Sequence, residues 1–183
     1  MKQMVWLVVS LTVMTGCSRY DVIPDRLEKQ VNREAKFEEI KESPTTYKGQ
    51  FVVMGGQVLS SERLEDKTRI EVLQLPLTDD LMPANERAKS NGRFVAVDRG
   101  KEMGKDSVDP AVVKQGTPVT VVGEVVGKTR ITIGETEQEV PRLRIADLTV
   151  WDKERWERDY TYYRPYWGYP YWWGYPYRYG YFY

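Results

Sequence analysis

The sequence predicts a small, mainly β domain, and three observations lead to that prediction. Six short segments between residues 50 and 150 are rich in valine, isoleucine and leucine, residues that favour strands. Polar or glycine-containing turns separate these segments at short intervals. The first segment contains the pair Gly55-Gly56, which allows a strand to bend. A strongly bent first strand that pairs with two neighbours is typical of a five- to six-stranded, OB-like β-barrel, which we favour over a β-sandwich.

The predicted strands are marked in different ways. Boundary residues mark some of them. Pro118 opens one segment, at a position where a proline costs no ladder hydrogen bond, and Gly134-Glu135 separates the last two segments. Residues 68–75 alternate, with Ile70 and Val72 on one face. Residues 60–66 are polar and predict a turn. The predicted strands are residues 50–59, 68–75, 92–97, 118–126, 129–133 and 141–150.

We place the predicted barrel domain at residues 37–152, and a short helix or a tether precedes it. Leu27 and Val31 are four residues apart, a helical spacing that fits a short helix beginning near Pro24-Asp25. Residues 17–36 are otherwise polar and charged, so a tether is the other interpretation, and the sequence leaves both open. Residues 37–40 fit one more helical turn, which Ser43-Pro44 ends.

Residues 1–16 have the pattern of a lipoprotein signal peptide. Residues 4–14 carry no charge after a basic start, and they are too short to cross a bilayer as a helix. They lead into Met14-Thr15-Gly16-Cys17, which resembles the lipobox of bacterial lipoproteins. That resemblance implies cleavage between Gly16 and Cys17 and acylation of the Cys17 thiol. The alternative is an inner-membrane anchor with an incidental cysteine.

Acylation of Cys17 would determine where the protein resides. Two or more acyl chains hold a protein stably on a membrane. Ser18 follows the cysteine, and by the same resemblance it favours the outer membrane, because aspartate at that position commonly marks retention in the inner membrane. We therefore expect outer-membrane lipid to be the partner of Cys17, with the protein on the periplasmic face in preference to the cell surface.

The composition excludes several classes of function. The chain has 183 residues, with 27 Lys+Arg, 27 Asp+Glu, no histidine and one cysteine. Without histidine there is no Ser-His-Asp or Cys-His catalysis, and one cysteine forms neither an internal disulfide nor a Cys-based metal site. The balanced charge argues against nucleic-acid binding, which normally requires a basic face. We expect no catalytic residues, no cofactor, no metal and no nucleic-acid partner.

Individual polar residues inside the predicted domain favour structural roles. We expect Arg93 to pair with a carboxylate such as Glu71 rather than to bind an anion. Gly55-Gly56 fits a barrel bend better than a ligand contact. The carboxylates in motif-like contexts are Glu71, Asp109, Glu135 and Asp147. Nothing in their spacing places two of them across a cleft, as a glycosidase requires. The ligand pattern of a calcium loop is absent around Asp79-Asp80 and around Asp106 and Asp109, so we predict solvated turns there.

An ordered series of motifs resembles a known family. The series is Phe37-x-x-Ile40, Pro44-x-x-Tyr47-x-Gly49, Gly55-Gly56, Thr68-x-Ile70-Glu71-Val72-Leu73, Pro76-Leu77, Ser90-x-Gly92-Arg93-Phe94, Asp109-Pro110, Val119-Thr-Val-Val-Gly123, Ile133-Gly134-Glu135, Pro141 and Trp151. It resembles the Slp family of starvation-inducible outer-membrane lipoproteins of Gram-negative bacteria. Met54 departs from the aromatic residue that such proteins often place before the glycine pair. The resemblance implies a lipid-anchored β-barrel protein of the envelope, linked to stress, with no established catalytic residues.

Residues 153–183 form a charged linker followed by an aromatic tail. Fifteen of the 23 aromatic residues lie between residues 160 and 183, and Trp-Gly-Tyr-Pro-Tyr occurs at residues 167–171 and again at 173–177. The repeated prolines and glycines oppose a strand, so we predict a disordered, low-complexity segment. The candidate contact residues of the tail are Tyr166, Trp167, Tyr171, Trp172, Trp173 and Tyr177.

The tail has three possible functions, and the alternative is a low-complexity segment with no special function. Tyrosine and tryptophan favour the membrane–water interface, so the tail would be a second membrane contact beside Cys17. Flat rings also stack on sugars, which predicts binding to envelope glycan. Tyrosine-rich repeats also self-associate. We favour membrane contact, because the lipid already confines the chain to that surface.

Two functions for the whole chain remain at this stage. The first is a non-catalytic structural or protective role in the cell envelope under starvation or stress. The second is an envelope binding module that recognises glycan (peptidoglycan or lipopolysaccharide) or a protein partner through the barrel face or the aromatic tail. The sequence leaves the oligomeric state open.

Overall fold

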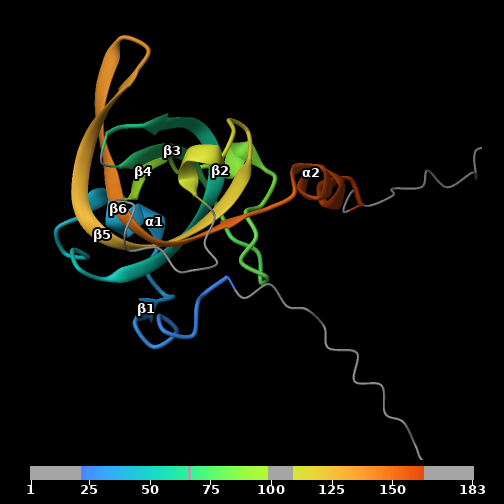
Figure 1. Ribbon diagram of the computed structural model, residues 1–183, viewed down its shortest axis with the longest axis horizontal. Coiled ribbons are helices and arrows are strands. Elements are labelled where there is room, and N and C mark those ends of the chain that lie inside the picture. The colour runs from blue at the N-terminus through green and yellow to red at the C-terminus, as the bar shows by residue number, and fades with distance from the viewer. Residues whose placement is uncertain (1–21, 66, 99–108, 163–183) are drawn as a thin grey trace, which may run out of the picture.

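The computed structural model describes residues 22–65, 67–98 and 109–162, which fold into a twisted barrel with short helices at its surface (Figure 1). The elements over these residues are β1 (Val31–Asn32), α1 (Phe37–Glu42), β2 (Phe51–Arg63), β3 (Thr68–Leu75), η1 (Arg87–Lys89), β4 (Arg93–Asp98), η2 (Pro110–Val112), β5 (Pro118–Ile133), β6 (Thr136–Val150) and α2 (Lys153–Tyr162). Strands predominate, so the prediction of a mainly β domain is confirmed.

The barrel closes through pairing between β2 and β5. The sheet runs in the order β1-β2-β3-β4-β6-β5, and β5 returns to pair with β2. The barrel strands pair antiparallel except for β4 and β6, which run parallel. Closure leaves the core inside one continuous sheet rather than between two packed sheets. The OB-like barrel is therefore confirmed over the sandwich.

Strand β2 belongs to both halves of the barrel, and its glycine pair makes this possible. Its residues 51–57 pair with β5, whereas residues 55–63 pair with β3, so the two pairings overlap at residues 55–57, which include the glycine pair. A Cβ atom on Gly56 would lie 2.1 Å from the Leu73 carbonyl oxygen. Because neighbouring backbone fills that space, the interpretation of the glycine pair as a barrel bend is confirmed.

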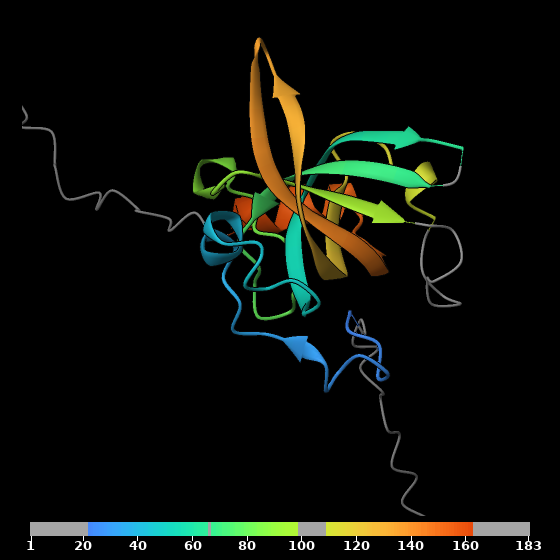
Figure 2. The same cartoon turned by 90° about the vertical axis from the view of Figure 1, so that its left-hand side faces the viewer.

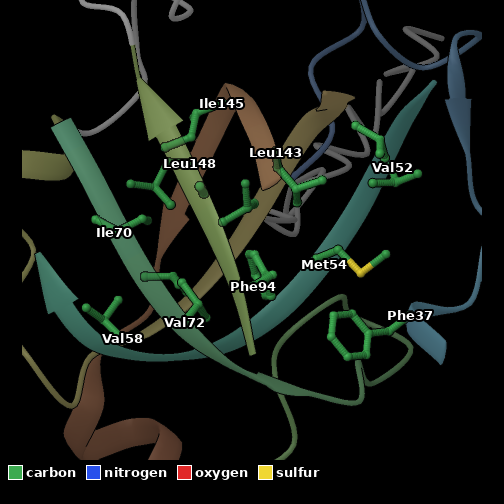
Figure 3. Close-up of a cluster of buried hydrophobic side chains, with 14 of the residues drawn as sticks. Phe37, Val52, Met54, Val58, Ile70, Val72, Phe94, Leu143, Ile145 and Leu148 are labelled. Carbon is green, nitrogen blue, oxygen red and sulfur yellow. The ribbon is translucent and has the colours of Figure 1, made fainter. Parts of the chain in front are cut away.

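The core fills the barrel with side chains from alternate strand positions. Figure 3 shows Ile70 and Val72 of β3 pointing inward toward Phe94 of β4. Helix α1 packs at one end of this core, where the Phe37 ring lies 6.3 Å from that of Phe94. The predicted helical turn at residues 37–40 is confirmed. The other core residues labelled in Figure 3 are Val52, Met54, Val58, Leu143, Ile145 and Leu148.

Three strands are longer than the sequence suggested, and one of them, β6, begins at Thr136 rather than at the predicted Pro141. Residues 60–63 continue β2 instead of forming the predicted turn, and β5 is one strand where two were predicted. The interruption between those two is a bulge at Gly127, whose φ of 123° shifts the register without ending the pairing. Ladder hydrogen bonds to the partner strand therefore outweigh the local turn signal. The turn at Gly134-Glu135 is confirmed, because Ile133 pairs directly with Thr136.

The segment before the barrel packs against it without forming a helix. Residues 25–30 form hydrogen-bonded turns, and β1 then pairs in parallel with Phe51 and Val52 of β2. β1 pairs there because β3 pairs with β2 only from Gly55 onward. The apolar positions of the predicted helix still predict burial correctly, since Leu27 is buried. Residues 22–32 are called the N-terminal segment below.

Residues 153–162, which we expected to be a charged linker, form helix α2. The Asp152 carboxylate accepts a hydrogen bond from the Arg155 amide at 2.7 Å, the arrangement of a helix N-cap. Trp156 is buried, and its Nε1 donates to the Pro83 carbonyl at 2.6 Å. Among the side chains of α2 that the structure describes, residues 153–158, Trp156 is the one buried against the barrel.

Candidate functional site: a cationic groove on the barrel

A groove lies on the outer face of β3, β4 and β6. Phe94 and Ala96 of β4 face the core, so the alternate residues Val95 and Val97 face outward. In the sheet, Val97 lies between Arg69 of β3 and Arg144 of β6. Cross-strand pairing therefore places the two valines between Arg69 on the β3 side and two arginines, Arg142 and Arg144, on the β6 side. Glu71 is the β3 residue opposite Val95.

The long hairpin of β5 and β6, which we call the β5–β6 hairpin, forms one wall of this groove. Its buried residues Ile131 and Val140 pack with Val95, and Val97 packs against the same cluster. The base of the hairpin therefore packs against the outer face of β4, and its tip projects beyond the barrel (Figure 2). The opposite wall is the turn between β2 and β3, which contributes Leu64 and Lys67.

The groove encloses about 740 Å³, enough for a small ligand or a short stretch of polymer. Its described lining residues are Leu64, Lys67, Arg69, Val95, Val97, Val126, Thr129, Arg130, Arg142, Leu143 and Arg144. Five of these lining residues are basic, and none of the described lining residues is an aspartate or glutamate. The basic residues are Lys67, Arg69, Arg130, Arg142 and Arg144. The lining is therefore cationic although the whole chain is neutral.

Carboxylates outside the lining balance some of these cations. Glu124 lies 3.0 Å from Arg144, and two longer contacts join Arg69 to Glu62 at 3.8 Å and Arg130 to Glu139 at 3.9 Å. The guanidinium of Arg142 has neither hydrogen bond nor ion pair within the part of the chain that the structure describes, and it is exposed. Arg142 is thus available to a ligand.

Glu139 lies on β6 of the hairpin, directly opposite Arg130 of β5. The Lys128 ammonium donates a hydrogen bond to its carboxylate, and this bond, with the charges of Lys128 and Arg130, lowers the pKa of Glu139 although desolvation opposes the shift. The Glu139 carboxylate therefore balances part of the positive charge that Lys128 and Arg130 bring to the hairpin.

The polar residues singled out from the sequence lie on separate elements. Arg93 forms an ion pair with Glu71 at 2.7 Å, which confirms the expected salt bridge. The Asp109 side chain accepts from the Ala111 amide at 2.8 Å and caps η2, and Glu135 lies in the hairpin turn. Within residues 22–65, 67–98 and 109–162, no group of three or more Cys, Asp or Glu residues could hold a metal ion.

A protein-family comparison identifies the chain. The model of the outer membrane lipoprotein Slp family matches residues 14–178, nearly the whole sequence. The chain belongs to the Slp family of outer membrane lipoproteins. The predicted family is therefore confirmed, and the match reaches from the lipobox-like motif into the aromatic tail.

Two relatives of this Slp family chain support the assignment. An uncharacterized protein of Haemophilus influenzae is 26% identical over 138 residues, covering 75% of this chain and 70% of the relative. The uncharacterized lipoprotein YeaY of Escherichia coli is 26% identical over 140 residues, covering 76% and 67%. One of these two relatives is thus described as a lipoprotein.

Solved structures with a similar arrangement of strands differ widely in sequence from the Slp family chain. An OBody bound to hen egg-white lysozyme is 13% identical, with a TM-score of 0.41, covering 67% of this chain and 97% of its own. A single-stranded DNA-binding protein from Streptomyces coelicolor is 11% identical, with a TM-score of 0.35, covering 57% and 95%. Likenesses this weak carry no conclusion about the function of the Slp family chain.

The predicted lipid and tail sites fall outside the described residues. Gly16 and Cys17 precede residue 22, and the tail residues Tyr166, Trp167, Tyr171, Trp172, Trp173 and Tyr177 follow residue 162. No helix within the described part of this Slp family chain is long and apolar enough to span a bilayer.

The groove of the Slp family chain was not predicted from its sequence. One signal was present, since Arg142 and Arg144 flank Leu143 in a predicted strand and therefore share its outer face. The other lining cations come from β3, from the turn before it and from β5. Only the closed barrel brings them together.

Proposed function

We propose that this chain is a non-catalytic protein of the outer membrane, anchored by acylated Cys17 on the periplasmic face, whose barrel binds an acidic group of an envelope glycan. Membership of the Slp family supports the membrane and the lipid anchor. The cationic groove is the observation that supports binding. Protection of the envelope under starvation or stress is the role to which such binding would contribute.

The chemistry of the groove suits carboxylates or phosphates on a polymer. Guanidinium groups form paired hydrogen bonds with these anions, and arginine occurs on both sides of the valine strip. The valines provide an apolar surface against which a sugar ring can lie. Lining cations without a lining carboxylate, over the described residues, suit binding better than general acid–base catalysis.

The binding proposal is tested with arginine variants of the full-length protein. Arg69→Gln together with Arg142→Gln should weaken binding to purified peptidoglycan sacculi or to lipopolysaccharide vesicles at least tenfold, because each removes a charge-assisted hydrogen bond. Sedimentation with each probe separates the two sources of anion. Arg33→Gln together with Arg155→Gln, exposed cations outside the groove, is the matched control. Equal loss in both pairs, or no loss in the groove pair, would contradict the proposal.

A further inference from the structure

The barrel is held close to the proposed lipid anchor. Only residues 18–21 separate Cys17 from Val22, and Val22 is already buried, with 3% of its surface exposed. Five residue steps extend at most about 18 Å. The barrel therefore cannot move far from a membrane that holds Cys17.

The N-terminal segment is fixed to the barrel by several contacts. Ile23 and Leu27 are buried in a cluster with Val122 of β5 and Ala146 of β6. The Arg26 guanidinium donates to the Ala146 carbonyl at 2.9 Å, and β1 adds its pairing with β2. Apolar burial, a side-chain hydrogen bond and backbone pairing together prevent the barrel from rotating freely on this segment.

The groove wall projects from the other end of the molecule. In both views the tip of the β5–β6 hairpin lies at the end opposite the N-terminal segment (Figures 1 and 2). From Gly127 to Ile133 the hairpin extends about 20 Å at the usual rise of a strand. The N-terminal segment and the tip of the groove wall therefore lie at opposite ends of the described residues.

We propose that the N-terminal segment orients the barrel, with the segment beside the lipid headgroups and the β5–β6 hairpin directed into the aqueous space. The groove then faces a polymer beyond the anchoring leaflet, and its ligand is a carboxylate-bearing glycan of the cell wall rather than a phosphate of the anchoring membrane. This inference rests on the proposed anchor and binding function, and it specifies which of the two glycans is bound.

The orientation is tested with acylated, full-length protein in phospholipid vesicles. Lys29→Cys, in the N-terminal segment, and Glu135→Cys, at the hairpin turn, each provide one free thiol for a fluorophore, because Cys17 is acylated. A phospholipid with a nitroxide headgroup should quench the probe at residue 29 at least threefold more than the probe at residue 135. Equal quenching, or stronger quenching at residue 135, would overturn the orientation.

A variant with a longer tether tests whether the short connection to Cys17 is what orients the barrel. About twelve Gly/Ser residues inserted after Arg19 add roughly 20 Å of reach without altering a described residue. The quenching difference between the two sites should then fall at least twofold; an unchanged difference would show that the short tether does not orient the barrel.

The ligand assignment has its own readout. Vesicle-bound protein should capture solubilised peptidoglycan fragments, and free lipopolysaccharide should compete at least tenfold less well. Preferential binding of lipopolysaccharide would overturn this assignment while leaving the proposed groove intact. Binding of neither probe by the soluble, non-acylated protein would instead overturn the proposed function.

Discussion

Trp156 attaches helix α2 to the barrel through one side chain. It is 3% exposed, whereas its neighbours Arg155 and Glu157 are exposed. Its indole nitrogen also satisfies the Pro83 carbonyl, so the ring contributes both burial and a hydrogen bond. The sequence shows the charged residues of this stretch clearly. It does not show which loop supplies a pocket for the single tryptophan, and for that reason the helix was predicted as a linker.

Trp156→Ala should lower the free energy of unfolding by about 3 kcal/mol, the usual cost of removing a large buried ring. Urea denaturation followed by circular dichroism measures the change. Arg155→Ala, on the exposed side of the same helix, should cost less than about 0.5 kcal/mol. Similar values for the two variants would mean that α2 does not stabilise the barrel through Trp156.

Arg142 and Arg144 show what can be predicted at the scale of one residue. Strand alternation correctly puts both on the face opposite Leu143. Their neighbours across the sheet depend on the parallel pairing of β4 with β6, which joins segments far apart in sequence. The direction of each side chain was therefore predictable, but the groove that they line was not.

At the scale of elements, pairing outweighs local sequence. Polar residues 60–63 and the glycine at residue 127 both indicate turns, yet each lies inside a strand. In both places the partner strand continues, so ending the strand would leave backbone groups of the partner without hydrogen bonds. The hairpin turn at Gly134-Glu135 was predicted correctly because it is local: glycine adopts its φ of 64° without strain.

The β5–β6 hairpin should respond to acid through Glu139. Its pKa is lowered in the folded protein, so the ionised carboxylate stabilises the fold above the unfolded pKa of about 4.3, and that contribution is lost as the pH falls through the folded value. Glu139→Gln should therefore destabilise the hairpin at pH 6 but not at pH 2.5. Hydrogen exchange of the amides in residues 128–139 measures the difference.

Glu137→Gln is the matched control for this titration, because Glu137 lies on the same strand, is exposed, and forms no ion pair within the described residues. It should leave the exchange rates nearly equal at both pH values. An equal effect of Glu139→Gln at pH 6 and pH 2.5 would show that the Lys128–Glu139 contact does not stabilise the hairpin.

At the scale of the whole molecule, the described barrel, the proposed lipid site and the aromatic tail occupy separate parts of the sequence. Residues 14–178 match one family, although the structure describes only part of that span. The lipid site could be proposed from sequence alone, because the motif around Cys17 is local. The fold could be predicted because valine-rich segments and the glycine bend are both visible in the sequence. The tail remains a prediction.

Cys17→Ala should leave uncleaved precursor in the inner membrane, because without the thiol no acyl group is added and no cleavage follows. Immunoblots of separated membranes measure both the size and the location of the protein. Ser18→Ala, which leaves the thiol in place, should be cleaved and should reach the outer membrane. Normal cleavage and outer-membrane fractionation of Cys17→Ala would contradict the proposed anchor.

Removal of the tail tests its proposed membrane contact. A non-acylated chain that ends at Tyr162 keeps α2 and Trp156, and it should lose at least tenfold in binding to phospholipid vesicles, because aromatic side chains favour the interface. Sedimentation measures the loss. Full-length protein with Trp167, Trp172 and Trp173 changed to Ala should show a smaller loss, and changing them to Phe should restore most of the binding. Equal vesicle binding with and without the tail would exclude this role.

Because β2 pairs with both β3 and β5, it also determines the order in which the strands of the barrel can pair during synthesis. β2 and β3 can pair early, but β2 reaches its second partner only after β5 has been made. The N-terminal segment packs on Val122 and Ala146, so its own site is absent until β5 and β6 are both in place. Residues 22–32 are therefore made well before the strands on which they pack. The N-terminal segment is thus among the first of the described residues to be made and among the last to find its packing partners.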